Sequence, residues 1–322
     1  MSSVALLPRV VLNRVFAAFA LITAVLVITP VSQADDRYAS IVIDVGSDQV
    51  LHDRFADSPR YPASLTKVMT LYMVFDALDN GQLTLEEELP VSSRASQAAP
   101  SKLGLAPGST ISVEDAILAL VTKSANDVAI VVGERLGGSE SRFAALMTVK
   151  ARALGMQNTR FYNASGLPDT RQISTARDMA TLAAHIMEDH GDYYSYFQTR
   201  SFSWGGRTYG NHNNLLGSVE GVDGIKTGYT RASGFNLMST AERNGNRIIT
   251  VVLGGATSRA RDAHVTELLE AAFQAIELTG PAQPDLRTRI AFQAIQNPDE
   301  TNLTALANTL QLEQGSTVGG GE

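Results

Sequence analysis

The sequence predicts an α+β fold in which an antiparallel sheet is flanked by helices and interrupted by an inserted helical subdomain. Three observations lead to this expectation: a strand pair near the start, a long middle region with helical periodicity, and a later run of strands joined by hairpin signals. Strands and helices that occur in separate runs are typical of α+β folds.

The strand pair comes first. Residues 40–45 are rich in β-branched side chains, which favour strands, and Gly46 begins a turn. Val50 and Leu51 then start a return strand, so a hairpin is expected here.

The middle region changes to helical spacing at Ser64, where apolar residues recur every three or four positions, and Gly81 is a suitable stop. Ser112 can cap a second helix. The helices are expected at about 64–80, 112–122, 127–136, 140–154 and 175–189.

The later region consists of strands and one closing helix. Gly205-Gly206 and Asn244-Gly245 are two-residue hairpin signals. The strands are expected at 202–204, 207–209, 222–229, 235–243 and 247–253. An amphipathic helix at about 260–278 follows.

Both ends of the chain differ from this region. Arg9 and Arg14 precede an uncharged apolar run at 15–29, and Ser32-Gln33-Ala34 offers small residues for cleavage. Residues 1–34 are therefore predicted to be a secretory signal peptide. The catalytic domain is expected at 35–280, and residues 281–322 are expected to be a polar, partly disordered tail. These features predict an exported protein of the periplasm or cell envelope, with membrane contact only through the signal segment if it is uncleaved.

Composition excludes several function classes. The net charge of −7 argues against a nucleic-acid partner, because binding there requires cations that neutralise phosphates. Cysteine is absent, so no thiolate metal site is possible. The five histidines show no zinc spacing, and His185 and His190 are expected to be solvated helix residues. We expect neither a metal nor a cofactor.

Ser64 and Lys67 form the first candidate catalytic pair. Positions i and i+3 share one helix face, so the Lys67 amine can reach the Ser64 hydroxyl. Serine needs an adjacent base to act as a nucleophile, and lysine serves only if its pKa is lowered by about 3 units. Desolvation and a second cation would both lower it. Alone the motif is weak, since a helix cap with a solvated lysine gives the same pattern.

Two further motifs follow. Ser124 and Asn126 lie between two expected helices, where a hydroxyl and an amide can face one cleft or simply cap a helix. Lys226 and Thr227, on an expected strand, can bind a carboxylate, and Gly228 allows close approach of a substrate backbone. Together the three motifs predict a serine acyl-transfer site, because motif and structural context agree.

The chain resembles the low-molecular-mass penicillin-binding proteins that act as D-alanyl-D-alanine carboxypeptidases. The resemblance covers roughly 38–278, including the stretches 62–70, 123–127, 166–168, 174–179 and 223–230. It implies the penicillin-binding/β-lactamase-like transpeptidase fold. The stretch after Gly280 is expected to be too short for the second β-domain that many members carry.

The resemblance also implies a role for each site residue. Ser64 would be the acylated nucleophile and Lys67 its base, while Ser124 would relay a proton to the leaving amine. The other residues would bind substrate. Asn126 would hold the substrate amide, and Lys226 and Thr227 the terminal carboxylate. The backbone N–H groups of Ser64 and Tyr229 would form an oxyanion hole beside Gly228. Arg261 resembles a family arginine near the cleft, whereas His212 stands where an arginine is more usual.

The implied activity is removal of the terminal D-alanine from peptidoglycan pentapeptides through an acyl-enzyme on Ser64, with β-lactams as covalent inhibitors. A class A β-lactamase would need a Glu-x-x-Leu-Asn loop, and residues 163–168 contain none. A Ser-His-Asp hydrolase would need a Gly-x-Ser-x-Gly elbow, which is also absent. A D,D-endopeptidase acting on cross-links and a non-catalytic binder of β-lactams or wall fragments remain as alternatives.

Overall fold

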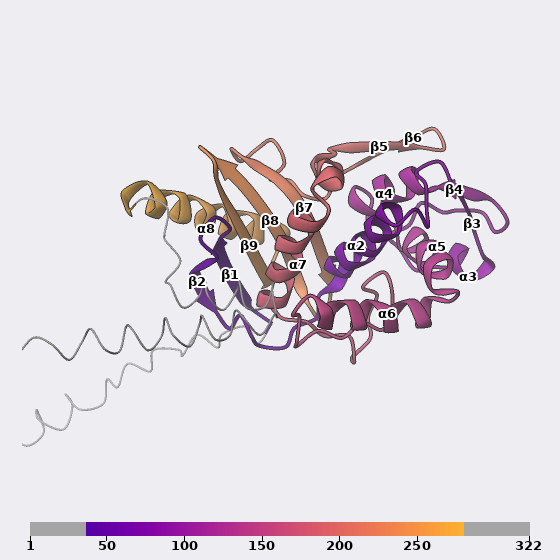
Figure 1. Ribbon diagram of the computed structural model, residues 1–322, viewed down its shortest axis with the longest axis horizontal. Helices are drawn as coiled ribbons and strands as arrows, with labels where there is room; N and C mark the ends of the chain where they lie inside the picture. The colour runs from indigo at the N-terminus through magenta and orange to yellow at the C-terminus, as the bar shows by residue number, and fades with distance from the viewer. Residues whose placement is uncertain (1–36, 280–322) are drawn as a thin grey trace, which may run out of the picture. The chain divides into compact units, whose positions relative to one another are not determined.

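The computed structural model describes residues 37–279, and its centre is a five-stranded antiparallel sheet in the order β2-β1-β9-β8-β7 (Figure 1). The strands are β1 (Ala39–Asp44), β2 (Gln49–Arg54), β7 (Val222–Thr230), β8 (Gly234–Arg243) and β9 (Asn246–Gly255). The expected α+β fold is confirmed, and so are the expected hairpins β1–β2 and β8–β9. The strand β7 lies at one end of this order, so one of its sides is free of a strand neighbour.

Each face of the sheet is covered by a helix. Side chains alternate between the two faces along every strand, so neighbouring residues of one strand pack against different helices. Leu237 and Ile248 pack with the helix α8 (Ser258–Thr279), whereas their neighbours Met238 and Ile249 belong to the core that includes α7 (Ala176–Asp189). The two hydrophobic clusters therefore lie on opposite sides of one sheet.

A helical subdomain is inserted between the strand pair β1–β2 and the strand β7, as predicted. The chain enters it through a 3-10 turn, η1 (Ala63–Leu65), followed by α2 (Thr66–Asp79). It continues as α3 (Ser93–Ser96), α4 (Val113–Val121), α5 (Asn126–Gly137) and α6 (Glu140–Ala153). The Ser112 hydroxyl caps α4 by accepting from the backbone N–H of Asp115 at 3.1 Å.

The structure differs from the sequence prediction in three short elements. The helix α2 begins at Thr66 rather than Ser64, because the first turn is of the tighter 3-10 type. The subdomain also contains the small hairpin β3 (Glu88–Pro90) and β4 (Thr110–Ser112), and the 3-10 helix η2 (Gly191–Gln198) follows α7. The predicted hairpin β5 (Ser201–Trp204) and β6 (Arg207–Gly210) is present.

The two end segments, 1–34 and 281–322, lie outside the described residues. Predictions of a signal peptide and a polar tail therefore stay predictions. Within 37–279, none of the helices combines the length and apolar character that crossing a membrane requires.

Candidate active site

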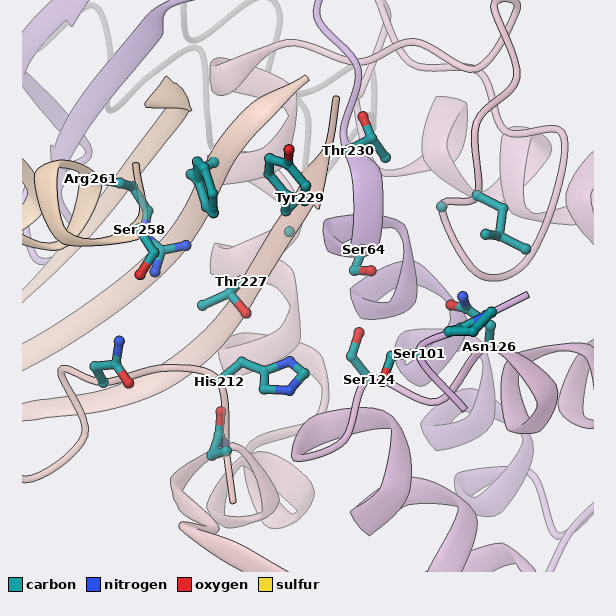
Figure 2. Close-up of a pocket in the computed structure, with 17 residues that line it drawn as sticks. Ser64, Ser101, Ser124, Asn126, His212, Thr227, Tyr229, Thr230, Ser258 and Arg261 are labelled. Atoms are coloured by element: carbon teal, nitrogen blue, oxygen red, sulfur yellow. The ribbon is translucent and has the colours of Figure 1, made fainter. Parts of the chain in front are cut away.

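A cleft of about 550 Å³ opens along the free side of β7, between η1 and the helical subdomain (Figure 2). Seven of the nine predicted site residues line it: Ser64, Ser124, Asn126, Thr227, Gly228, Tyr229 and Arg261. The other two, Lys67 and Lys226, are buried and do not line it. Among its described lining residues there is no aspartate or glutamate.

Lys67 is fully buried beneath the nucleophile candidate, with its Nζ 3.3 Å from the Ser64 Oγ. The same Nζ donates to the Asn126 Oδ1 at 2.7 Å and to the Ser165 backbone oxygen at 2.5 Å. A neutral amine has two N–H groups and one lone pair. The two acceptors use both N–H groups, so the lone pair is left for the Ser64 hydroxyl.

The electrostatics of the site favour this neutral amine. Desolvation by burial lowers the pKa of Lys67 well below its ordinary value, and the positive charge of Lys226 lowers it further. Asp127 acts in the opposite direction. Desolvation has a larger effect on the Lys67 pKa than the Asp127 charge, so a neutral Lys67 amine is able to accept a proton.

Ser124 occupies the joint between α4 and α5 in a strained conformation. Its φ of 57° lies in the left-handed region, which a non-glycine residue adopts only at a cost. Its Oγ is buried, has no hydrogen-bond partner among the described residues, and points toward Ser64 in Figure 2. An unpaired buried hydroxyl is costly to the fold, and the Ser124 hydroxyl is available to hydrogen-bond a molecule bound in the cleft.

The chain segment at 99–104 is held by Asn126 and Asp127, at the start of α5. The Asn126 Nδ2 donates to the Ala99 backbone oxygen at 2.9 Å. The buried Asp127 carboxylate accepts from the backbone N–H groups of Leu103 and Gly104. Asp127 had no predicted role, and the only sequence signal for one is its place as an acidic residue in the first turn of a helix.

The strand β7 supplies the opposite wall. Lys226 is buried, donates to the Thr227 backbone oxygen at 3.1 Å, and has its pKa lowered to about 7 by desolvation and by the charge of Arg261. A Cβ added at Gly228 would lie 3.0 Å from both the Pro62 oxygen and the Ser64 nitrogen. A glycine is therefore what allows β7 to approach the nucleophile turn so closely.

Three more side chains complete this side. Tyr229 is exposed and packs against Phe235, with the two rings tilted and their centroids 4.2 Å apart. Arg261, on α8, is buried and donates to the Asn236 oxygen at 2.8 Å and to Asp262. His212 also lines the cleft, and desolvation together with the charges of surrounding lysines and Arg261 lowers its pKa to about 4. His212 is consequently neutral at pH 7.

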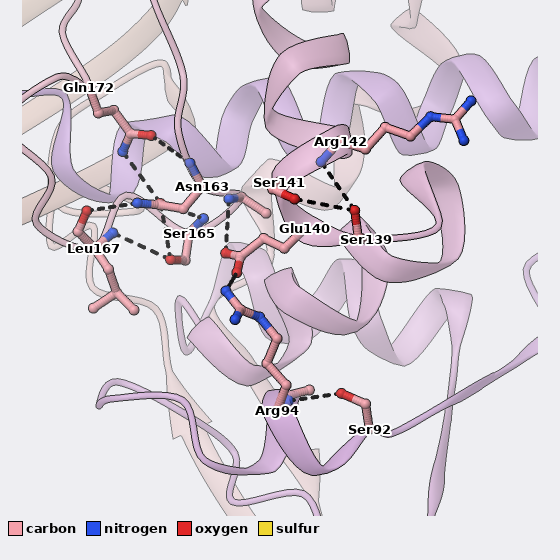
Figure 3. Close-up of polar contacts among 12 residues, drawn as sticks. Ser92, Arg94, Ser139, Glu140, Ser141, Arg142, Asn163, Ser165, Leu167 and Gln172 are labelled. Carbon is pink, nitrogen blue, oxygen red and sulfur yellow. Dashed lines mark hydrogen bonds and ion pairs between the residues drawn. The ribbon is translucent and has the colours of Figure 1, made fainter.

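The loop at 163–172 fixes the acceptor that holds Lys67 (Figure 3). The Asn163 Oδ1 accepts from the backbone N–H groups of Ser165 and Gly166 at 3.2 and 2.7 Å. The buried Glu140 accepts from the Ala164 N–H at 3.3 Å and pairs with Arg94 at 2.6 Å. Glu140 therefore supports the loop and does not line the cleft.

Gly166 is the tightest point between this loop and the nucleophile turn. Its φ is +83°, and an added Cβ would lie 1.8 Å from the Ala63 oxygen. We expect Gly166→Ala to lower the free energy of unfolding by at least about 3 kcal/mol, because the overlap is with backbone. Urea denaturation measures it. Gly155→Ala is the control, since Gly155 has φ +84° but open space around it; equal losses in both variants would contradict the packing argument.

His185 and His190 are not among the residues that line the cleft. The expectation of a solvated residue is wrong for His190, which is buried and bonds Asp79 at 2.8 Å. Within the described residues, His185, Glu188 and Asp189 offer ligand atoms within 4.8 Å of one another. None of them is buried, and such groups are common without a metal.

The sequence matches a family model and several curated proteins. A family model described as D-alanyl-D-alanine carboxypeptidase matches residues 29–257. The chain is 32% identical over 252 residues to the D-alanyl-D-alanine carboxypeptidase DacF of Bacillus subtilis. It is 36% identical over 257 residues to DacC of Escherichia coli. These alignments cover 76% and 78% of this chain but 64% of each relative, so the chain spans less than two thirds of their length.

Solved structures agree. The D-alanyl-D-alanine carboxypeptidase DacD from Francisella tularensis gives a TM-score of 0.72 at 29% identity, covering 73% of this chain and 70% of that one. Penicillin-Binding Protein D2 from Listeria monocytogenes in its ampicillin-bound form gives 0.67 at 33% identity, covering 73% and 96%.

Proposed function

Because the chain belongs to the D-alanyl-D-alanine carboxypeptidase family, we propose that it is a serine peptidase that removes the terminal D-alanine from peptidoglycan pentapeptides. The observation that best supports this is the buried Lys67 amine against the Ser64 hydroxyl, in a cleft flanked by cations. A nucleophile with a base within reach suits acyl transfer, and the cations suit a substrate that ends in a carboxylate.

The reaction begins at Ser64. The Lys67 amine takes the hydroxyl proton while Oγ attacks the carbonyl carbon between the two D-alanines. The backbone N–H groups of Ser64 and Tyr229 stabilise the oxyanion. Ser124 then gives its hydroxyl proton to the leaving nitrogen and regains one from the Lys67 ammonium, the C–N bond breaks, and D-alanine departs. Water hydrolyses the remaining ester, which releases the tetrapeptide and restores Ser64.

The other site residues hold the substrate. Asn126 binds the amide of the acyl part, and its own contact with Lys67 ties substrate binding to the position of the base. Lys226, Thr227 and Arg261 bind the terminal carboxylate, which lies where positive charge is concentrated. Fixing that carboxylate orients the scissile bond over Ser64.

β-Lactams would acylate the same serine. No aspartate or glutamate lines the cleft within the described residues, so no carboxylate is placed there to activate a deacylating water. We therefore propose a long-lived adduct, and Penicillin-Binding Protein D2 from Listeria monocytogenes, with ampicillin and cefotaxime bound forms, supports it by similarity.

The place of action follows from the substrate. We propose an exported protein of the periplasm or cell envelope, since wall peptides lie outside the cytoplasm. The segment that would direct export, 1–34, lies outside the described residues.

Mass spectrometry of uncross-linked and cross-linked wall peptides tests the proposal. The expected result is loss of one D-alanine from the pentapeptide while cross-links remain intact. Cleavage of cross-links instead would make the protein an endopeptidase. No change in either, together with stable β-lactam binding, would make it a binder.

A pH profile tests the roles of the two buried lysines. Lys226 is protonated below about pH 7 and neutral above it, so the KM of carboxylate substrates should rise by up to about tenfold per pH unit on the alkaline side. On the acid side, kcat/KM should fall as Lys67 becomes protonated. A peptide with an amidated C-terminus is the control. A KM that stays flat to pH 9 would contradict carboxylate binding by Lys226.

A further inference from the structure

Asp127 lies in the first turn of α5, directly after the cleft residue Asn126, but it does not line the cleft itself. Its carboxylate is fully buried. The backbone N–H groups of Leu103, Gly104 and Leu105 donate to this carboxylate at 3.1, 2.8 and 3.1 Å. All three partners are donors, so the arrangement suits an ionised carboxylate, which can only accept.

These N–H groups belong to the segment 99–105, which forms part of the cleft wall. Its Ser101 lines the cleft next to Asn126 (Figure 2), and the Ser101 oxygen accepts from the Asn126 backbone N–H at 2.7 Å. The Ala99 oxygen accepts from the Asn126 Nδ2 at 2.9 Å. Because the segment takes the Nδ2 side of the amide, the Asn126 Oδ1 is left facing Lys67 at 2.7 Å.

Asp127 also acts on the base through its charge. Desolvation and the charge of Lys226 on β7 favour the neutral Lys67 amine, whereas the charge of Asp127 favours the ammonium. His212, in the loop before β7, feels the charge of Lys67 but is itself neutral at pH 7. Among residues 37–279, Asp127 therefore supplies the negative charge that limits how far the pKa of Lys67 is lowered.

We propose that Asp127 is a positioning residue of the acylation reaction, which orients Asn126 through the segment 99–105 and supplies the counter-charge that keeps Lys67 a strong base. The inference rests on the proposed function and adds a residue to it. Without this counter-charge, Lys67 would lose its own proton at lower pH but would take the Ser64 proton less readily. One buried carboxylate thus controls both the orientation of the substrate-binding amide and the strength of the base.

Asp127→Asn tests the charge, because asparagine has the same shape but no negative charge, and its Nδ2 cannot accept a hydrogen bond. Stopped-flow acylation by a chromogenic β-lactam between pH 4 and 9 measures the effect. The acid limb should move to lower pH. At the pH where the wild type has half of its plateau rate, the variant should have at least about three quarters of its own plateau. The plateau itself should fall at least about tenfold, since Asn126 is less well placed and the base is weaker.

Asp178→Asn is the matched control, because Asp178 is also a buried carboxylate in the first turn of a helix, α7. It accepts from the Asn158 backbone N–H at 2.8 Å and from the Thr159 hydroxyl at 2.6 Å, and it is not among the groups that shift the pKa of Lys67. Both variants should have a lower melting temperature, but the acid limb of Asp178→Asn should coincide with that of the wild type. An acid limb that moved in both variants, or in neither, would overturn the counter-charge role.

Two variants that keep the charge test the positioning. Gly104 has φ +85° with open space around it, so Gly104→Ala strains the segment without touching Asp127. Its plateau rate should fall at least about threefold while its acid limb stays in place. Asp127→Glu should behave in the same way, because the longer side chain misplaces the carboxylate. Gly108→Ala is the control for strain alone, since Gly108 has φ +81° and open space but lies outside the segment.

Wild-type plateau rates in both Gly104→Ala and Asp127→Glu would overturn the role of the segment, and these two variants decide that point even if Asp127→Asn does not fold. An acylation profile unchanged in Asp127→Asn would overturn the inference and leave the peptidase function intact. A wild-type protein that is not acylated and cleaves no wall peptide would overturn both.

Discussion

Ser64→Ala is expected to abolish both peptide turnover and covalent β-lactam binding. In the proposed reaction, the Ser64 Oγ is the only protein atom that forms a covalent bond with the substrate. Alanine offers no atom that could form this bond. In serine peptidases, loss of the nucleophile lowers kcat by several powers of ten, so we expect a loss of at least about 10⁴-fold here. Intact-protein mass after incubation with ampicillin should show the adduct in the wild type and none in the variant.

The control for this experiment is Ser141→Ala. Ser141 is an exposed serine on α6 whose hydroxyl hydrogen-bonds, among residues 37–279, to Ser139 alone. Its loss should leave both the adduct and turnover unchanged. Ser64→Ala should also keep its thermal stability, because the hydroxyl makes one long contact of 3.3 Å with Lys67. Turnover that survives in Ser64→Ala would overturn the acyl-enzyme mechanism.

The positions of the candidate catalytic residues could be predicted because local patterns place them. Ser64 and Lys67 share one turn, and Ser124 and Lys226 lie where the sequence predicts a joint between two helices and a strand. Where two such elements meet is decided by long-range packing. Gly228 of β7 against the Ser64 turn is an example, since only the fold brings positions so far apart in the sequence together.

Contacts between distant residues explain what the sequence could not predict. In the sequence, Glu140 is an ordinary acidic residue in the first turn of a helix. In the structure it is buried and supports the loop whose Ser165 oxygen binds Lys67. His190 follows a helix and looks solvated, but α2 brings Asp79 against it. The strands β3 and β4 are each three residues long, too short for any periodicity to appear.

Lys67→Arg is expected to lower the rate of acylation by on the order of 10³-fold or more. Arginine keeps donors for Asn126 and Ser165, but it stays protonated throughout the pH range of the assay, so it cannot accept the Ser64 proton. In the wild type, burial and the charge of Lys226 lower the pKa of Lys67, so acylation should rise as pH rises through that pKa. In the variant this rise should be absent, and stopped-flow acylation by a chromogenic β-lactam between pH 5 and 9 would show it.

The flat pH profile, more than the lost rate, tests the base itself. A variant that merely misplaced Ser64 would be slow at every pH but would still speed up as a base lost its proton. Lys150→Arg is the matched control, because the partly exposed Lys150 pairs with Asp76 at 2.7 Å and should tolerate arginine with unchanged acylation. If Lys67→Arg kept a wild-type pH dependence at a reduced rate, the base would be another group. In that case Lys67 would act by holding Asn126 and the loop at Ser165 in place.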